Sequence, residues 1–176
     1  MQNNKTFWPY GIALSLFLVI IACVITIIIG SKNPVHIDNF YFDKYQYVED
    51  NFYDIQQKDA KFKSEFDFDF NHTFRTYKNP YTKKTFDVID IKTNKDNTLS
   101  FKLTPKSSKT INDIKIEALL TKPDTNDFNQ KLDTIITKDG FYITINPNKI
   151  GRWQIMIKLI SSDDSISFYK YELYSN

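Results

Sequence analysis

The stretch Glu65-Phe66-Asp67-Phe68-Asp69-Phe70 decides the fold class, because its aromatic residues recur at every second position. Successive side chains of a β-strand point to opposite faces, so the three phenylalanines would share one face and the three acids the other. We therefore expect a strand with one face in a core and one in solvent. The acids follow one solvated face, whereas Ca²⁺ needs about six to eight converging oxygens, so no calcium site is expected.

Segments with strand character continue at regular intervals from this point to the end of the chain. They cover residues 86–91, 99–103, 114–120, 132–136, 141–145, 153–160 and 166–173. Turn-forming Asn, Asp, Pro and Gly residues separate them. The pattern predicts a mainly β domain over residues 65–176, an antiparallel immunoglobulin-like β-sandwich of about seven or eight strands.

The composition narrows the classes of protein that the chain can belong to. The net charge is +2, and 15 Phe and 11 Tyr are too many for a disordered chain. A near-neutral surface gives no electrostatic reason to bind nucleic acid, because that affinity comes largely from neutralised phosphates. The single Cys, Cys23, excludes an intramolecular disulfide.

Residues 34–63 form a juxtamembrane linker followed by an expected amphipathic helix. Apolar residues recur with helical spacing, which predicts a helix over residues 43–61. These residues are Tyr45, Val48, Phe52, Ile55 and Phe62. One interpretation is that this face packs on the following domain, and the other is that it docks on a membrane partner.

Residues 11–29 contain no ionisable group, and as a helix they would be about 28 Å long, close to the hydrocarbon thickness of a bilayer. Trp8 and Tyr10 suit the interface, and Pro9 suits a first helical turn. We expect a transmembrane helix after a short cytoplasmic tail, residues 1–10, with the domain exported. The sequence Ile20-Ile21-Ala22-Cys23 also fits a lipoprotein cleavage site, but the apolar run continues beyond Cys23.

The membrane segment carries a stripe of small or hydroxylated residues. Gly11, Ser15, Ala22 and Thr26 are spaced by +4, +7 and +4, which places them along one side of a helix. Such stripes allow close packing of membrane helices. We expect this side to contact a partner helix, and the alternative is that these residues are only tolerated in lipid.

The domain offers little that would support catalysis. Its only glycines are Gly140 and Gly151, so there is no Gly-rich phosphate loop, and the only Cys lies in the membrane segment. We therefore do not expect an enzyme, a cofactor or a small-molecule substrate. His72 and Met156 are weak metal-ligand candidates and leave open a copper-binding or copper-delivery domain, since copper sites use several His, Met or Cys ligands.

Several motifs together resemble the FixH/CcoH family of membrane-anchored factors for assembly of cbb3-type cytochrome c oxidase. They are Trp8-Pro9-Tyr10, residues 34–41, residues 118–123, Asp139-Gly140-Phe141-Tyr142 and Gly151-Arg152-Trp153-Gln154. Lys122 departs from the family, where an Arg is more usual before the proline. The resemblance implies a single-pass protein of the bacterial inner membrane with a periplasmic domain, no cofactor, and oxidase subunits as partners.

The resemblance and the residue pattern together give the candidate functional residues. Asp38, Asn39, Tyr41 and Tyr45 join the membrane stripe as candidate partner contacts. Gly140, Tyr142, Gly151 and Trp153 are expected to be structural, with Trp153 at the centre of the sandwich core. A scaffold for another envelope complex would share all these features.

Overall fold

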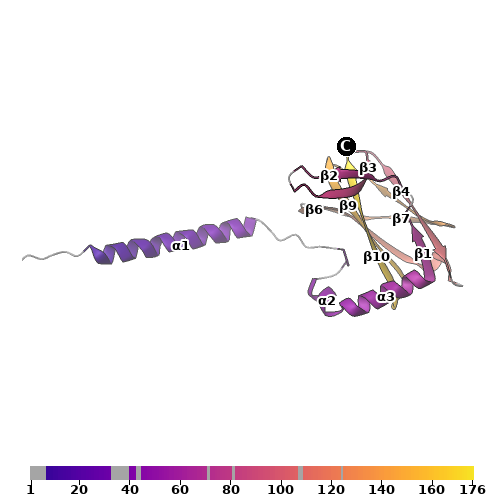
Figure 1. The fold of residues 1–176 in the computed structure, drawn as a ribbon, viewed down its shortest axis with the longest axis horizontal. Helices are drawn as coiled ribbons and strands as arrows, with labels where there is room; N and C mark the ends of the chain where they lie inside the picture. The colour runs from indigo at the N-terminus through magenta and orange to yellow at the C-terminus, as the bar shows by residue number, and fades with distance from the viewer. Residues whose placement is uncertain are drawn as a thin grey trace, which may run out of the picture. The chain divides into compact units, whose positions relative to one another are not determined.

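The computed structural model describes residues 7–32, 40–42, 45–70, 72–80, 82–106, 109–123 and 125–176. The chain forms two units, residues 1–35 and residues 36–176. In the part of the chain that the structure describes, the first unit contains one helix, and the second contains two short helices and a β-sandwich (Figure 1).

The first unit is the helix α1 (Trp8–Lys32). It extends beyond the expected span of residues 11–29 at both ends, so residues 8–10 belong to the helix and not to the tail. Within the 24 residues Trp8–Ser31, an 18-residue window reaches a mean hydropathy of 3.3, and the side chains are exposed along the whole length. This helix is long and apolar enough to cross a bilayer.

The expected helix over residues 43–61 is divided in two, α2 (Tyr45–Asp50) and α3 (Phe52–Glu65). The break falls at Asn51, whose backbone has left the helical region (φ −113°, ψ 16°). Its side-chain amide donates to the carbonyl of Tyr47 at 2.9 Å. Asparagine disfavours helix interiors because its side chain competes for backbone partners in this way.

The face that α3 buries also differs from the expected one. Phe62 is fully buried, but Phe52 is 45% exposed. The Phe62 ring stacks on Phe66 with centroids 5.0 Å apart. The C-terminal part of α3 is therefore the part that joins the domain core.

Within the described residues, ten strands form two sheets. The four-stranded sheet has the order β1 (Phe66–Asp69), β4 (Asn97–Pro105), β8 (Gly140–Ile145) and β7 (Thr134–Thr137). The six-stranded sheet has the order β2 (Arg75–Lys78), β3 (Thr85–Ile91), β10 (Ser165–Ser175), β9 (Gly151–Ser162), β5 (Lys115–Lys122) and β6 (Thr125–Leu132). A single 3₁₀ turn, η1 (Ile111–Asp113), precedes β5.

The strand order is that of an immunoglobulin-like sandwich. The sheet β1-β4-β8-β7 corresponds to strands A, B, E and D of that fold, and β5, β9 and β10 correspond to C, F and G. The strand β6 then takes the place of C′, and β3 that of a second segment of strand A beside G. The fold class is therefore confirmed as a mainly β, immunoglobulin-like sandwich preceded by an apolar helix.

Three details of the expected sandwich are wrong. The pairing is not entirely antiparallel, because residues 88–91 of β3 run parallel to residues 172–175 of β10. The polar strands β2 and β6 were largely missed, because they lack a clear apolar alternation. The expected strand over residues 132–136 is interrupted at Asp133, where the chain passes from β6 in one sheet to β7 in the other.

The core lies between the sheets and centres on Trp153, which is fully buried. Its indole N–H donates to the carbonyl of Lys149 at 2.9 Å. Phe101 and Phe141, on the other sheet, belong to the same buried cluster. Tyr142, which the sequence placed among the structural residues, is instead 40% exposed on the outer side of β8.

Gly140 is the one glycine that the packing requires. Its φ is +154°, and a Cβ atom there would lie 1.9 Å from the carbonyl oxygen of Phe101. Gly151 has φ +114°, but a Cβ atom would meet only the Lys122 ammonium at 3.4 Å. Gly140 therefore permits a close approach of β8 to β4, and Gly151 supplies only a backbone conformation.

The helix α3 packs on the first half of β10, and the second half of β10 pairs with β3. Ser167 donates to the Asp59 carboxylate at 2.5 Å, and Ser165 donates to the Glu65 carboxylate at 2.7 Å. Glu65 was expected on a solvated strand face, but it ends α3 with its side chain only 16% exposed. The helix thus covers a stretch of β10 that β3 does not reach (Figure 1).

Candidate interaction surface

The outer face of the six-stranded sheet carries a group of interacting polar and aromatic side chains. The strand registers place alternate residues of β3, β5, β9 and β10 on this face, opposite to those in the core. It consists of Phe86, Val88, Asp90, Glu117, Leu119, Thr121, Arg152, Gln154, Met156, Lys158, Phe168, Lys170, Glu172 and Tyr174. We refer to these residues as the outer face.

A charged network occupies the middle of the outer face. Arg152 donates two hydrogen bonds to Glu172, at 2.7 and 2.9 Å, and Gln154 donates a third at 2.7 Å. The guanidinium also lies 3.8 Å from the centroid of the Phe86 ring. The side chains of Arg152 and Glu172 are only 23% and 17% exposed, so long polar side chains lie flat over this part of the sheet.

A second ion pair lies nearer the β2 edge. Arg75 donates to both oxygens of Asp90 at 2.7 Å, and the guanidinium lies 5.6 Å from the centroid of Tyr174. Tyr77 packs beside the same tyrosine, with centroids 4.8 Å apart. The hydrogen bond from Arg75 holds the pKa of Asp90 below its usual value, so this pair stays charged at neutral pH.

An aromatic turn, Phe40-Tyr41-Phe42, lies against the other part of the outer face. The Tyr41 ring meets Phe168 edge-on with centroids 5.2 Å apart, and Phe40 lies 6.3 Å from the same ring. The Lys170 ammonium lies 5.3 Å from the Phe40 ring centroid. Tyr41, a candidate partner contact from the sequence, therefore packs on the chain's own sheet.

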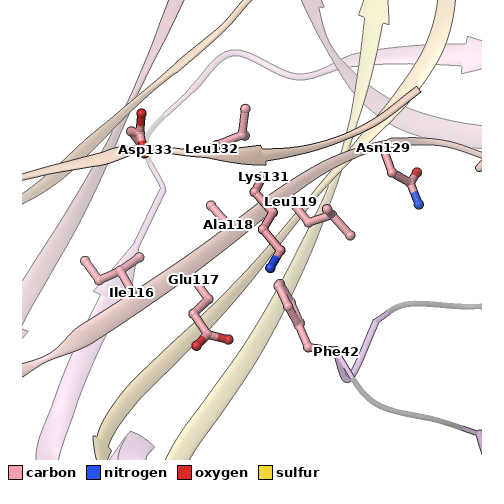
Figure 2. A pocket seen from close by; sticks show the side chains of 9 residues that line it. All are labelled: Phe42, Ile116, Glu117, Ala118, Leu119, Asn129, Lys131, Leu132 and Asp133. Atoms are coloured by element: carbon pink, nitrogen blue, oxygen red, sulfur yellow. The ribbon is translucent and has the colours of Figure 1, made fainter. Parts of the chain in front are cut away.

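Phe42 completes this turn and borders a groove of about 560 Å³. Its φ is +59°, a conformation that non-glycine residues seldom adopt. Figure 2 shows Phe42 approaching from the segment before α2, with β5 and β6 on the other side of the groove. The remaining lining residues are Ile116, Glu117, Ala118, Leu119, Asn129, Lys131, Leu132 and Asp133.

The groove combines an apolar floor with charges of both signs. Of its lining residues, Ala118 is buried, whereas Lys131 and Asp133 are exposed. Lys115 donates to Glu117 at 2.6 Å, and this hydrogen bond holds the pKa of Glu117 below its usual value.

The two metal-ligand candidates lie in different parts of the sandwich, His72 in the segment between β1 and β2 and Met156 on β9. The imidazole Nε2 of His72 accepts a hydrogen bond from the backbone N–H of Ser100, on β4, at 3.4 Å. Met156 is buried on the outer face of the six-stranded sheet, opposite Leu119 and Lys170. The structure therefore does not bring them together, and the described residues contain no group of three His, Cys, Asp or Glu residues placed to hold a metal ion.

The membrane stripe is formed as the spacing indicated, but its hydroxyl groups are bonded within the helix. Ser15 donates to the carbonyl of Ile12 at 2.8 Å, and Thr26 donates to the carbonyl of Ala22 at 2.9 Å. A Cβ atom on Gly11 would meet no heavy atom within 4 Å. The stripe thus presents small side chains on one side of the helix, and its two hydroxyl groups already donate to carbonyl groups of the same helix.

Asp38 and Asn39 lie outside the described residues, and Tyr45 is the first residue of α2. The sequence missed Phe168, Arg152 and Glu172 as members of one surface. Alternation along β10 signals an outward face there, but only the strand register shows which residues of β9 lie beside it.

Comparison with known proteins adds no family or functional assignment. No family model matches the chain, and no curated protein matches it. The known structures that it resembles include the Lin-41 filamin domain, with a TM-score of 0.35, 11% identity, and coverage of 48% of this chain and 81% of that one. Two others are murine CRIg, with a TM-score of 0.31, 10% identity and coverage of 60% and 99%, and FetP from uropathogenic E. coli, with a TM-score of 0.29, 12% identity and coverage of 59% and 97%. Such low similarity carries no functional argument.

Proposed function

We propose that this chain is a non-enzymatic, membrane-anchored factor for assembly or stabilisation of a cbb3-type cytochrome c oxidase. The observation that carries the anchored binding role is the unburied apolar helix Trp8–Ser31 in the same chain as an immunoglobulin-like sandwich. The oxidase as partner comes from the resemblance to the FixH/CcoH family.

The proposed arrangement places the N-terminus in the cytoplasm, one helix in the bacterial inner membrane and the sandwich in the periplasm. The helix would contact oxidase helices through Gly11, Ser15, Ala22 and Thr26, since small residues permit close approach of two backbones. The sandwich would contact exported parts of the oxidase through the groove beside Phe42. No small-molecule substrate or nucleic acid takes part.

The first experiment is deletion of the gene, followed by measurement of cbb3 oxidase activity and haem spectra in isolated membranes. The proposal expects both to fall in the deletion strain and to recover when the full-length chain is supplied. Normal oxidase content and activity in the deletion strain would overturn it. Co-purification with a different envelope complex would then identify the chain as a scaffold of that complex.

A helix exchange tests whether the membrane helix does more than anchor. Residues 11–29 are replaced by an unrelated membrane helix of equal length, and insertion and export are checked separately. If export is intact and oxidase activity falls, the stripe is part of the binding surface. If activity stays at the wild-type level, the helix is only an anchor.

The variant Phe42→Ser tests the groove of the sandwich. The matched control is Phe74→Ser, because Phe74 is 44% exposed and is not among the residues that line the groove. The proposal expects oxidase assembly to fall in Phe42→Ser and to persist in Phe74→Ser, at equal amounts of protein in the membrane. Equal assembly in the two variants would exclude the groove as the contact.

A further inference from the structure

The edge strand β7 differs from the other edge strands of the sandwich in having no charged residue. The two sheets end in β1 and β7, and in β2 and β6. Each of β1, β2 and β6 carries charges, in the sequences FDFD, RTYK and TNDFNQKL, whereas β7 reads TIIT. Charges on edge strands prevent pairing with other chains, so β7 is the edge left open to such pairing.

Exposed apolar side chains gather at the same edge. Ile135 is 65% exposed and Ile136 is 38% exposed. Tyr142 lies directly opposite Ile135 on the neighbouring strand β8 and is 40% exposed. Of the described strand residues, these three are the large apolar or aromatic side chains that remain exposed to this degree.

We propose that β7 pairs antiparallel with β7 of a second copy of this chain, which joins two four-stranded sheets into one. A two-fold axis normal to the sheet requires one residue to face its own copy. With Ile135 at the axis, Thr134 of each copy lies opposite Ile136 of the other. The residues Tyr142 and Ile135 of both copies then form one continuous apolar row on the outer side of the joined sheet.

The segment itself favours a second copy as the occupant. The sequence Thr134-Ile135-Ile136-Thr137 has the same residue types in both directions, and β-branched residues pair well across strands. Asp133 precedes it and Lys138 follows it. Antiparallel pairing therefore brings the acidic end of one strand to the basic end of the other, whereas parallel pairing would bring like charges together.

The paired strands would contribute only four residues each, which is a short interface. The inference therefore also relies on both copies being anchored in the same membrane. Two copies held in one membrane by the proposed anchor meet at a high effective concentration, which allows a small contact to be occupied. The pairing goes beyond the proposed oxidase function and does not depend on the oxidase being the partner. Oxidase assembly is therefore not its readout.

Disulfide trapping in isolated membranes tests the pairing on the full-length chain. Cys23 is first replaced by Ala, and Ile135→Cys is introduced; facing residues of antiparallel strands approach closely enough for a disulfide. The matched control is Ile150→Cys, because Ile150 is 68% exposed but lies outside the strands. On mild oxidation we expect a disulfide-linked homodimer of Ile135→Cys, formed about tenfold or more in excess over the control.

Equal cross-linking of the two variants, or a cross-linked product of another mass, would overturn the proposal. A second measurement separates β7 from the helix as the source of any dimer. Energy transfer between fluorescently labelled copies of the full-length chain, reconstituted together in one bilayer, is compared for wild type, Ile135→Lys and Ile150→Lys. We expect energy transfer for wild type and Ile150→Lys and its loss for Ile135→Lys, because like charges would face each other at the axis. Energy transfer at the wild-type level for Ile135→Lys would contradict pairing through β7.

Discussion

Arg152 binds Glu172 through two hydrogen bonds of 2.7 and 2.9 Å, although the two residues lie 20 positions apart in the chain. The pair joins β9 to β10 on the outer face and receives a further hydrogen bond from Gln154. Because both charged side chains are mostly covered, removal of either partner leaves the other poorly solvated.

The variant Arg152→Met should therefore lower the free energy of unfolding by about 1–3 kcal/mol. Thermal and denaturant unfolding of the full chain in detergent, followed by near-UV circular dichroism, measures the loss. The control is Arg75→Met, which breaks a more exposed pair (49% and 41%) and should cost about 0–1 kcal/mol. Equal losses in the two variants would show that coverage of the Arg152 pair has no energetic effect.

Replacement of Trp153 tests the centre of the core. Trp153→Ala removes a fully buried ring and should destabilise the domain by about 3–5 kcal/mol through the cavity that it leaves. Trp8→Ala removes a tryptophan that is 74% exposed on α1 and should leave the unfolding midpoint of the sandwich unchanged. An unchanged midpoint in Trp153→Ala would disprove the core assignment.

Two glycine substitutions should differ in their cost. Gly140→Ala places a Cβ atom 1.9 Å from the Phe101 carbonyl oxygen, so β8 and β4 must separate. Gly151→Ala meets no such obstacle and carries only the strain of a positive φ, about 1–3 kcal/mol. We expect the larger loss of unfolding free energy in Gly140→Ala, and the reverse order would contradict the close approach of the two strands.

The acid stability of the domain should depend on Glu65. Burial alone would raise the pKa of this carboxyl, but hydrogen bonds from Lys109 and Ser165 outweigh that effect and hold its pKa below the usual value. The unfolded chain then binds the proton more readily. The stabilisation is complete above the ordinary Glu pKa of about 4.3 and is lost as the pH falls through the folded pKa.

The variant Glu65→Gln should therefore be less stable than wild type at neutral pH and should lose less stability on acidification. Unfolding midpoints between about pH 6 and pH 3 give both slopes. Lys109→Met removes one of the two donors and should reduce the slope in part. Equal slopes for wild type and Glu65→Gln would show that Glu65 is not the group responsible.

Local patterns in the sequence are sufficient to predict the helices and strands that have a distinct apolar face. The alternation at residues 65–70 and the apolar run at residues 11–29 each predict one element without reference to the rest of the chain. They do so because the side-chain period of a strand or helix determines which residues leave water together. The mainly β class, most strands and the single apolar helix follow from this.

Polar segments gave no comparable signal. The strand β2 reads RTYK and β6 reads TNDFNQKL, and both were missed because an edge strand is specified by its neighbours more than by its own apolar residues. The break at Asn51 was missed for a related reason, since one side-chain hydrogen bond decides it.

Local periodicity and composition specify which segments must be buried, because transfer of apolar side chains out of water depends on them. Which of these segments meet is seen in the folded chain alone: β3 lies parallel to β10, α3 packs on the first half of β10, Arg152 lies beside Glu172, and β7 lies at an open edge. These relationships join residues far apart in the chain. They depend on strand order and register. The same local pattern of apolar residues is compatible with more than one strand order and more than one register.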